Sequence, residues 1–371
     1  MNERILILGG GVIGLATAFE LSRRNYEVTV VEKSSCGGQA SGAAAGMLAP
    51  FSEIGEDPDD FFTFCRDSLL MFKNWQNEIK KVAETDFDFT ESGSLHAVYH
   101  EADLLALETR QSWQKKFGSK AELITGKTLH AMEPHLSDSV IAALYSPEES
   151  HVFSPDYVKA LKSACEKNGV TIEEKLSKVD VREWQDRLSL QSEDGRIFSG
   201  DKLIVCSGAW SNELEKIFGI RIPVFPIRGQ ICAYELGDEQ VNHIIYTSQG
   251  YLVPKTNETL VNGASEDMAG FQTTVTEKGI ARLTNWNKNV LPFLTSKAPF
   301  HTWAGLRPAT QDGFPLIGKL ETHSHIVFAT GHYRNGILLS PMTAFAVADL
   351  LDGKNEYAPL ASFKPERFSF I

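Results

Sequence analysis

The chain has 371 residues, of which 42% are apolar and 23% charged, values typical of a soluble globular enzyme. Its net charge of −12 disfavours a nucleic-acid partner, which requires a cationic surface. The five cysteines form no C-x-x-C pair and their number is odd, so neither a disulfide framework nor a cysteine zinc site is expected. The apolar run at residues 5–19 is interrupted by three glycines and is too short to span a membrane. We therefore expect a cytoplasmic protein with no metal site and no membrane partner.

The start of the chain predicts a βαβ unit. Residues 4–8 form a short apolar strand, residues 12–24 have helical periodicity, and residues 27–32 form a second apolar strand. Residues 34–50 are rich in glycine, serine and alanine, and such a run of small residues indicates that something approaches the backbone closely. A helix is expected next, at residues 59–82.

Strands and helices alternate through the rest of the chain. We expect strands at 94–100, 170–173, 178–184, 202–206 and 326–329, helices at 102–117, 156–168 and 276–290, and a strand-and-turn region at 222–263. In the last helix Ser340 fits the N-cap, Pro341 fits the first helical position, and Gly353 ends the helix.

The glycines between the first strand and the first helix follow the pattern Gly9-x-Gly11-x-x-Gly14. In a dinucleotide site the first glycine makes the tight turn, the second lets a pyrophosphate approach, and the third packs the helix on the strand. Glu32 ends the second strand, where a carboxylate can accept hydrogen bonds from ribose hydroxyls. Since strand, helix and acidic residue are all in place, the pattern favours a dinucleotide site over a chance glycine turn.

This motif alone does not separate NAD from FAD, because both cofactors contain the same ADP half. FAD presents its ring system far from the adenine, so it needs further backbone contacts. Residues 39–47 and a second glycine turn at residues 331–336 are candidates for these contacts, the alternative being that both are ordinary loops. A helix beginning near Pro341 would direct its positive end toward the flavin.

Six motifs, in chain order, resemble the D-amino-acid-oxidase family of flavoproteins, and within it the branch that oxidises glycine for thiamine synthesis. They are GGGVIG (9–14), VVEK (30–33), GAAAGM (42–47), CSGAWS (206–211), WAGLRPATQDG (303–313) and GHYRNGILL (331–339). The resemblance implies an α/β fold with a Rossmann-type FAD-binding domain and a second, mainly antiparallel β-sheet substrate domain. The FAD-binding domain would comprise residues 1–85, 148–222 and 300–371, and the substrate domain residues 86–147 and 223–299.

The resemblance also implies a noncovalent FAD site, since the last cysteine, Cys232, lies far from the C-terminal position through which some relatives attach the flavin. At Ala40 the family pattern has a hydroxyl residue, so one side-chain hydrogen bond is missing there. The cofactor-binding residues that it implies are Gly9, Gly11, Val12, Ile13, Gly14, Glu32, Lys33, Ala40, Ser41, Ala45, Gly46, Met47, Val179, His332, Tyr333, Arg334, Asn335, Gly336, Ile337 and Leu338.

Three residues are expected to bind the substrate. Arg307 lies in a segment with almost no other charge, and its guanidinium matches a carboxylate bidentately; the alternative is a structural ion pair. By the resemblance, Arg334 is a second arginine that contacts substrate and Tyr251 helps to hold the carboxylate. No catalytic acid or base is expected, because hydride transfer from a neutral amine needs none. His332 is therefore interpreted as a cofactor contact.

The activity implied by the resemblance is oxidative deamination of a small amino acid, glycine first, with dioxygen as the second substrate. The products would be hydrogen peroxide and the imine, which water converts to glyoxylate and ammonia or which feeds thiazole synthesis. Sarcosine, D-proline or another D-amino acid remains an alternative substrate of an oxidase or dehydrogenase of the same family. A flavin-binding subunit or tRNA-modification module is a further alternative that the negative charge disfavours. Relatives suggest a homotetramer.

Overall fold

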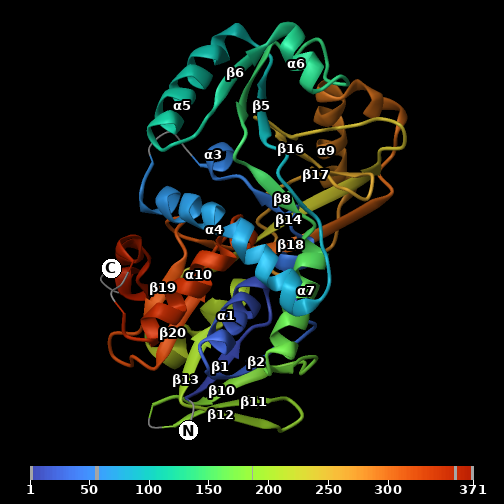
Figure 1. Ribbon diagram of the computed structural model, residues 1–371. Helices are drawn as coiled ribbons and strands as arrows, with labels where there is room; N and C mark the ends of the chain where they lie inside the picture. The colour runs from blue at the N-terminus through green and yellow to red at the C-terminus, as the bar shows by residue number, and fades with distance from the viewer. Residues whose placement is uncertain (1–2, 55–57, 186, 355–356, 369–371) are drawn as a thin grey trace.

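The computed structural model describes residues 3–54, 58–185, 187–354 and 357–368. Figure 1 shows two halves, one built on a six-stranded sheet near the N-terminus and one built on an eight-stranded sheet at the opposite end of the molecule. The α/β fold with two kinds of sheet is the fold class expected from the sequence, which is confirmed.

The six-stranded sheet has the order β19-β20-β13-β1-β2-β9, with four parallel neighbouring pairs and one antiparallel pair, β19–β20. After the exposed Arg4, strand β1 is apolar because both faces of the sheet are covered: Ile5 and Ile7 belong to one core cluster, Leu6 and Leu8 to another. The strands are β1 (Arg4–Leu8), β2 (Glu27–Val31), β9 (Thr171–Glu173), β13 (Lys202–Val205), β19 (Leu316–Lys319) and β20 (Ile326–Thr330).

Four helices cover the face that carries Ile5 and Ile7. They are α1 (Val12–Arg23), α4 (Asp60–Ala83), α7 (Ser154–Lys167) and α10 (Gly336–Leu351). Helix α1 lies between α7 and α10, and its first ten residues are all buried. The opposite face is covered by a three-stranded antiparallel sheet of β10 (Val179–Glu183), β11 (Leu188–Ser192) and β12 (Ile197–Gly200).

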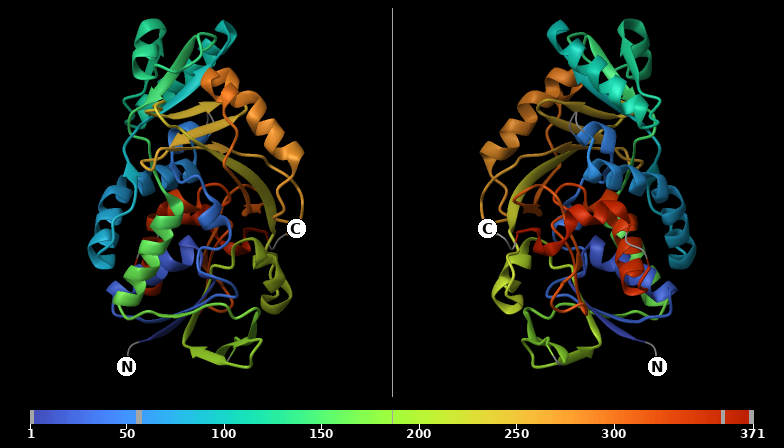
Figure 2. Two further views of the ribbon diagram at one scale, coloured as in Figure 1. Left: turned by 90° about the vertical axis from the view of Figure 1, so that its right-hand side faces the viewer. Right: turned by 90° about the vertical axis from the view of Figure 1, so that its left-hand side faces the viewer.

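The eight-stranded sheet has the order β18-β14-β17-β16-β15-β5-β7-β6 and is antiparallel except for the pair β15–β5. Helix α9 (Glu277–Val290) lies along its outer face, as Figure 2 shows, while α5 (Leu104–Lys116) and α6 (Gly126–Met132) lie near its far edge. The strands are β5 (Ser94–Val98), β6 (Glu122–Thr125), β7 (Ala142–Ser146), β14 (Val224–Glu235), β15 (Ile244–Thr247), β16 (Gly250–Pro254), β17 (Thr259–Gly263) and β18 (His301–Thr310).

Short elements join the two halves. A small sheet of β3 (Met47–Leu48), β8 (Ser150–Val152) and β4 (Phe89–Thr90) lies between them, next to the helices α2 (Ala40–Ala43) and α3 (Pro50–Glu53); α8 (Glu215–Phe218) precedes β14. The division of the chain into two domains stays a prediction. If the division follows the sheets, β18 goes with the eight-stranded sheet, because it pairs with β14 along ten residues, although the expected boundary at residue 300 separates them.

The start of the last helix differs from the prediction. Helix α10 begins at Gly336 with Asn335 as N-cap, so Ser340 is not the cap and Pro341 lies inside the helix. Pro341 cannot donate to the carbonyl of Ile337, and the Ser340 hydroxyl donates to that carbonyl instead, at 2.8 Å. The serine hydroxyl therefore replaces the backbone hydrogen bond that the proline cannot make inside this helix.

A second serine stabilises the same part of the helix from outside. The fully buried Ser68 of α4 donates to the Leu338 carbonyl at 2.6 Å and accepts from the Met342 amide at 3.3 Å. We expect Ser68→Ala to lower the free energy of unfolding by about 1–3 kcal/mol, because it leaves buried backbone groups without partners. The control is Ser112→Ala on the exposed side of α5, where the change should stay within about 0.5 kcal/mol. Denaturation at a fixed FAD concentration measures both, and equal losses would contradict the account.

Candidate active site

A cavity begins at the carboxyl ends of β1 and β2 and extends to β18 of the other sheet. The carboxyl edge of a parallel sheet is where doubly wound folds bind their ligands. The wall is formed by segments far apart in the chain: the first glycine turn, residues 39–47, the turn after β13, strand β18, and the turn that leads into α10. The wall extends from Glu32 to Arg307, which suits an extended cofactor together with a small second ligand.

The first glycine turn has the backbone geometry that a phosphate requires. Gly9 has φ +112°, and a Cβ there would lie 2.4 Å from the Cys206 carbonyl oxygen. Gly9, Gly11, Val12 and Ile13 line the cavity. Gly14 does not line it, because it packs α1 on β1: a Cβ there would lie 2.0 Å from the Gly9 carbonyl oxygen. The turn therefore leaves room for a ligand at the N-terminus of α1.

The acidic end of β2 is fixed by hydrogen bonds from its own chain. Glu32 accepts from the Gly10 amide at 2.7 Å and, through its other carboxylate oxygen, from the Ser34 amide at 2.8 Å. Beside it, the Lys33 ammonium lies 3.6 Å from the ring centroid of Trp210. Glu32, Lys33 and the more distant Val179 all line this end of the cavity, as expected.

The small residues at 39–47 allow the backbones of α2 and β18 to approach each other closely at the cavity wall. Gly305 of β18 lies against α2, where a Cβ would come within 2.6 Å of the Ala43 Cβ, and the indole of Trp303 donates to the Ala43 carbonyl at 3.0 Å. The cavity residues of this stretch include the expected Ala40, Ser41, Ala45, Gly46 and Met47. Ser41 also accepts a hydrogen bond from the Val12 amide at 2.9 Å, which ties the stretch to the start of α1.

The turn that leads into α10 is split between the cavity and the core. His332, Tyr333, Arg334, Gly336 and Ile337 line the cavity. The other two expected residues do not: Asn335 is the N-cap of α10, and the side chain of Leu338 is buried in the core among the helices.

His332 is held as a neutral side chain. Burial lowers the pKa of His332 to about 3, and its Nε2 lies 3.0 Å from the Thr343 hydroxyl. The imidazole is therefore uncharged at every pH at which the protein would be assayed, and its fixed hydrogen bond suits a cofactor contact better than a proton acceptor.

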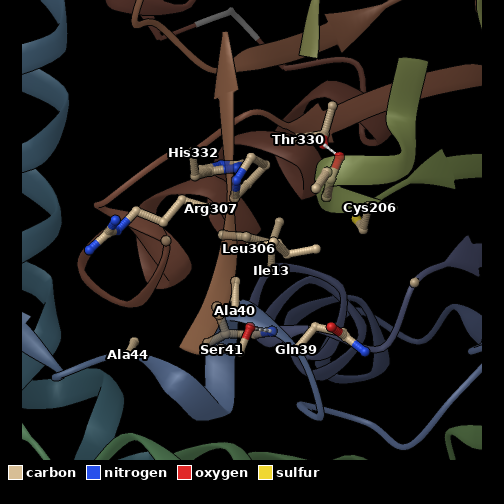
Figure 3. A pocket seen from close by; sticks show the side chains of 18 of the residues that line it. Ile13, Gln39, Ala40, Ser41, Ala44, Cys206, Leu306, Arg307, Thr330 and His332 are labelled. Carbon is tan, nitrogen blue, oxygen red and sulfur yellow. Dashed lines mark hydrogen bonds between the residues drawn. The ribbon is translucent and has the colours of Figure 1, made fainter. Parts of the chain in front are cut away.

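Arg307 occupies a position prepared by the register of two strands. In Figure 3 its side chain extends to one side of β18, away from Cys206 and Thr330. The guanidinium lies over Gly229 of β14, where a Cβ would come within 2.4 Å of Nη1, and it donates to the Ser265 carbonyl at 2.9 Å. Among the ion pairs between described residues none includes Arg307, so the alternative of a structural ion pair finds no support.

The other two expected substrate residues lie at the same end of the cavity. Tyr251 is buried, which raises the pKa of its hydroxyl, while the charge of the nearby Arg307 guanidinium acts in the opposite direction. Arg334 forms ion pairs with Glu53 at 3.6 Å and Glu266 at 3.4 Å. The carboxylate of Glu53 raises the pKa of Arg334 further, so this guanidinium is permanently charged and already paired.

Sequence reasoning missed Glu53 and the two glycines of the strand pair. Glu53 ends α3 and lines the cavity, and Gly229 and Gly305 lie directly opposite one another in β14 and β18. No local pattern marks any of the three, because their roles depend on which strands pair and on side chains that are distant in sequence. The motif CSGAWS was recognised, but its cavity-lining residues 206–210 were not proposed as contacts.

Comparison with known proteins places the fold and site in one family. The model of the family described as FAD dependent oxidoreductase matches residues 4–350. The chain belongs to this family. It is 30% identical to a glycine oxidase of Geobacillus kaustophilus over 98% of this chain and 96% of that one. The crystal structure of the glycine oxidase from that organism superposes with a TM-score of 0.93 over 99% of both chains, at 29% identity. A glycine oxidase structure from Bacillus cereus gives 0.90 at 30% identity, also over 99% of both chains.

The cofactor of this family member is FAD. The cavity fits FAD, because glycines take positions where side chains would fill the cavity. A fixed carboxylate, Glu32, also lies one strand away from the first glycine turn. Within the described part of the chain no helix is long and apolar enough to cross a membrane, and no group of three or more His, Cys, Asp or Glu side chains could hold a metal ion. The five cysteines are all free.

We expect the purified protein to be yellow and to release its flavin without breaking a covalent bond. Acid or heat should move free FAD into the supernatant, because no cysteine follows Cys232 in the sequence to take the attachment position that the family resemblance implies. Absorbance spectra of supernatant and pellet measure this. Colour retained on the denatured chain would contradict the noncovalent site.

Glu32→Ala should raise the dissociation constant of FAD roughly tenfold or more. The carboxylate that would accept the ribose hydroxyls contributes about 1.5–3 kcal/mol as a charged hydrogen-bond partner, and its loss also frees the Gly10 amide. Equilibrium ultrafiltration measures the constant. The matched control is Glu27→Ala at the exposed opposite end of the same strand, which should retain FAD normally. Equal retention by both variants would show that Glu32 does not contact the cofactor.

Proposed function

We propose that the protein is a glycine oxidase, which converts glycine, dioxygen and water to glyoxylate, ammonia and hydrogen peroxide. The observation that carries the proposal is Arg307, a guanidinium that faces the cavity without a carboxylate partner among the described residues. A half-buried cation of this kind is stabilised by a small anion, and the planar guanidinium matches a carboxylate. The glycine oxidases that resemble this chain over nearly its whole length support the same substrate.

The cofactor would be held by the residues of the cavity wall. The turn with Gly9 and Gly11 and the start of α1 would hold the diphosphate, Glu32 and Lys33 the adenosine, and Val179 the adenine. The stretch around Ala45, with the turn from His332 to Ile337, would line the flavin ring. When bound, FAD supplies the hydride acceptor and passes the electrons on to dioxygen.

The protein's part in the reaction is to bind and orient. Arg307, with the Tyr251 hydroxyl, would hold the carboxylate of glycine and so fix the position of the α-carbon. His332 stays neutral and accepts no proton at neutral pH, so the reaction requires the amine itself to be neutral when the hydride leaves. The side chain of Met47, whose sulfur lies 3.1 Å from the Tyr246 hydroxyl oxygen, narrows the same end of the cavity, which favours a small substrate.

We propose further that the enzyme works in the cytoplasm as a homotetramer and that its imine product feeds thiazole synthesis. The free cysteines are compatible with a reducing compartment, and the sequence motifs support the other two points. Size-exclusion chromatography with light scattering tests the tetramer, for which a mass near four times 41.1 kDa is expected.

Oxygen uptake with a panel of glycine, sarcosine, D-alanine and D-proline tests the function. The proposal expects glycine to be oxidised, with one hydrogen peroxide and one ammonia per dioxygen consumed. Turnover of D-proline or D-alanine with no reaction of glycine would contradict it. Flavin content is measured in the same preparation, so that an inactive panel with full FAD loading counts against the function rather than against the cofactor.

Arg307→Ala should lower kcat/KM on glycine by roughly 30-fold to several thousand-fold. Losing a charged hydrogen bond and leaving the carboxylate unpaired costs about 2–5 kcal/mol, at about tenfold per 1.4 kcal/mol. Arg307→Lys should restore only part of the activity, because an ammonium cannot form the planar bidentate pair. Steady-state kinetics with oxygen detection measure both variants.

The control for this prediction is methylamine, which has no carboxylate. Its slow oxidation should be nearly unaffected by Arg307→Ala, and the FAD content should stay normal. If glycine turnover survives the substitution, or if methylamine loses as much as glycine does, the carboxylate is bound elsewhere, and Arg334 is then the next candidate.

A further inference from the structure

Two neighbouring tyrosines at the substrate end of the cavity lie beside side chains of opposite charge. Tyr246 of β15 and Tyr251 of β16 are directly paired, with ring centroids 6.1 Å apart. The Tyr246 hydroxyl donates to Glu53 Oε1 at 2.9 Å, whereas the Tyr251 hydroxyl lies near the Arg307 guanidinium, whose charge acts to lower its pKa. The strand register therefore brings the tyrosines that neighbour a carboxylate and a guanidinium to paired positions at one end of the cavity.

The Glu53 side chain is largely buried, and only one of its two carboxylate oxygens contacts a partner among the described residues. Its side chain is 6% exposed, it lines the cavity, and Oε1 carries both the Tyr246 hydrogen bond and the 3.6 Å contact with Arg334. Among the described residues no hydrogen bond ends on Oε2. Oε2 is not among the buried polar atoms of the described residues that lack a partner, so it stays accessible, and a bound ammonium or amine would supply a donor to it.

The charges at this end of the cavity sum to zero before any substrate binds. Arg307 and Arg334 are balanced by Glu53 and by Glu266, which also accepts from the Tyr333 hydroxyl at 2.9 Å. A zwitterion such as glycine keeps this balance when it binds. A substrate with a second carboxylate would add an unpaired negative charge beside Glu53, because Arg334 is already paired.

We propose that Glu53 accepts the amine of the substrate and excludes substrates with a second carboxylate. In this arrangement Arg307 holds one end of the amino acid and Glu53 the other, while Arg334 positions Glu53 rather than binding a carboxylate itself. The inference rests on the proposed function, since it takes the substrate to be a small amino acid.

The test compares Glu53→Gln with the wild-type holoenzyme, using glycine, acetate and iminodiacetate as probes. Glutamine keeps the shape and the Tyr246 contact but removes the charge, so the KM for glycine should rise about 10- to 100-fold. Acetate carries no amine, and its dissociation constant, measured from the change it causes in the flavin absorbance spectrum, should stay the same or fall. Iminodiacetate is glycine with a carboxymethyl group on nitrogen, and its kcat/KM relative to glycine should rise at least tenfold.

Two further variants separate contact from structure. Glu53→Asp keeps the charge and should recover part of the glycine KM without gaining iminodiacetate activity. Glu266→Gln removes the other carboxylate partner of Arg334 but lies outside the cavity wall, so its glycine KM should rise less than that of Glu53→Gln. If both glutamine variants raise the glycine KM equally, the effect acts through Arg334 and the amine contact is wrong.

The result also separates this inference from the proposed function. If the wild type oxidises glycine and Glu53→Gln, with full FAD content, keeps the same KM, the inference fails and the function stands. If the wild type oxidises no glycine, the function fails. An acetate affinity that falls as much as the glycine affinity in Glu53→Gln would show a general disturbance of the site and would also overturn the inference.

Discussion

The substrate end of this protein depends on a half-buried guanidinium for which the described chain supplies no carboxylate. A charge held partly out of water without an ionic partner is less stable than a paired one, so a bound anion stabilises Arg307. Its position is made possible by the absence of a side chain at Gly229, and the opposite glycine, Gly305, lets the same strand rest on α2. One pair of glycines in register thus positions both the carboxylate site and the floor of the cofactor cavity.

Close backbone approach is the second constraint, and it explains why the site is assembled from separate parts of the chain. A ligand that runs from Glu32 to Arg307 needs small residues along its whole length, and no single strand or helix can supply them. The protein uses the first glycine turn, the stretch of residues 39–47 and the turn before α10, and joins them by contacts such as the one between Ser41 and the Val12 amide. The fold of a Rossmann-type sheet next to a large antiparallel sheet brings these three segments together.

Much of the cofactor site could be predicted from the sequence, because its signals are local. The spacing of Gly9, Gly11 and Gly14 between a strand and a helix, and an acidic residue at the next strand end, depend only on neighbouring residues. The last helix was mispredicted because Ser340 and Pro341 have the pattern of a helix start, whereas here the serine hydroxyl compensates for an internal proline. That distinction depends on where the preceding turn ends.

The residues that sequence reasoning missed are set by strand register and tertiary contact. Gly229 matters because the Arg307 guanidinium of the neighbouring strand lies over it. Glu53 matters because Tyr246, far along the chain, donates a hydrogen bond to it. Neither has a pattern in its own segment. Arg307 could be proposed from the sequence for the opposite reason, since an isolated charge in the segment TWAGLRPAT requires an explanation on its own.

The most direct measurement is a crystal structure of the reduced, FAD-loaded protein with glycine bound under anaerobic conditions, in which the substrate cannot be turned over. The account predicts two hydrogen bonds from the Arg307 guanidinium to the glycine carboxylate, the amine within hydrogen-bond distance of Glu53 Oε2, and Arg334 still paired with Glu53. A glycine whose carboxylate lies on Arg334, with Arg307 bound only to the Ser265 carbonyl, would contradict it.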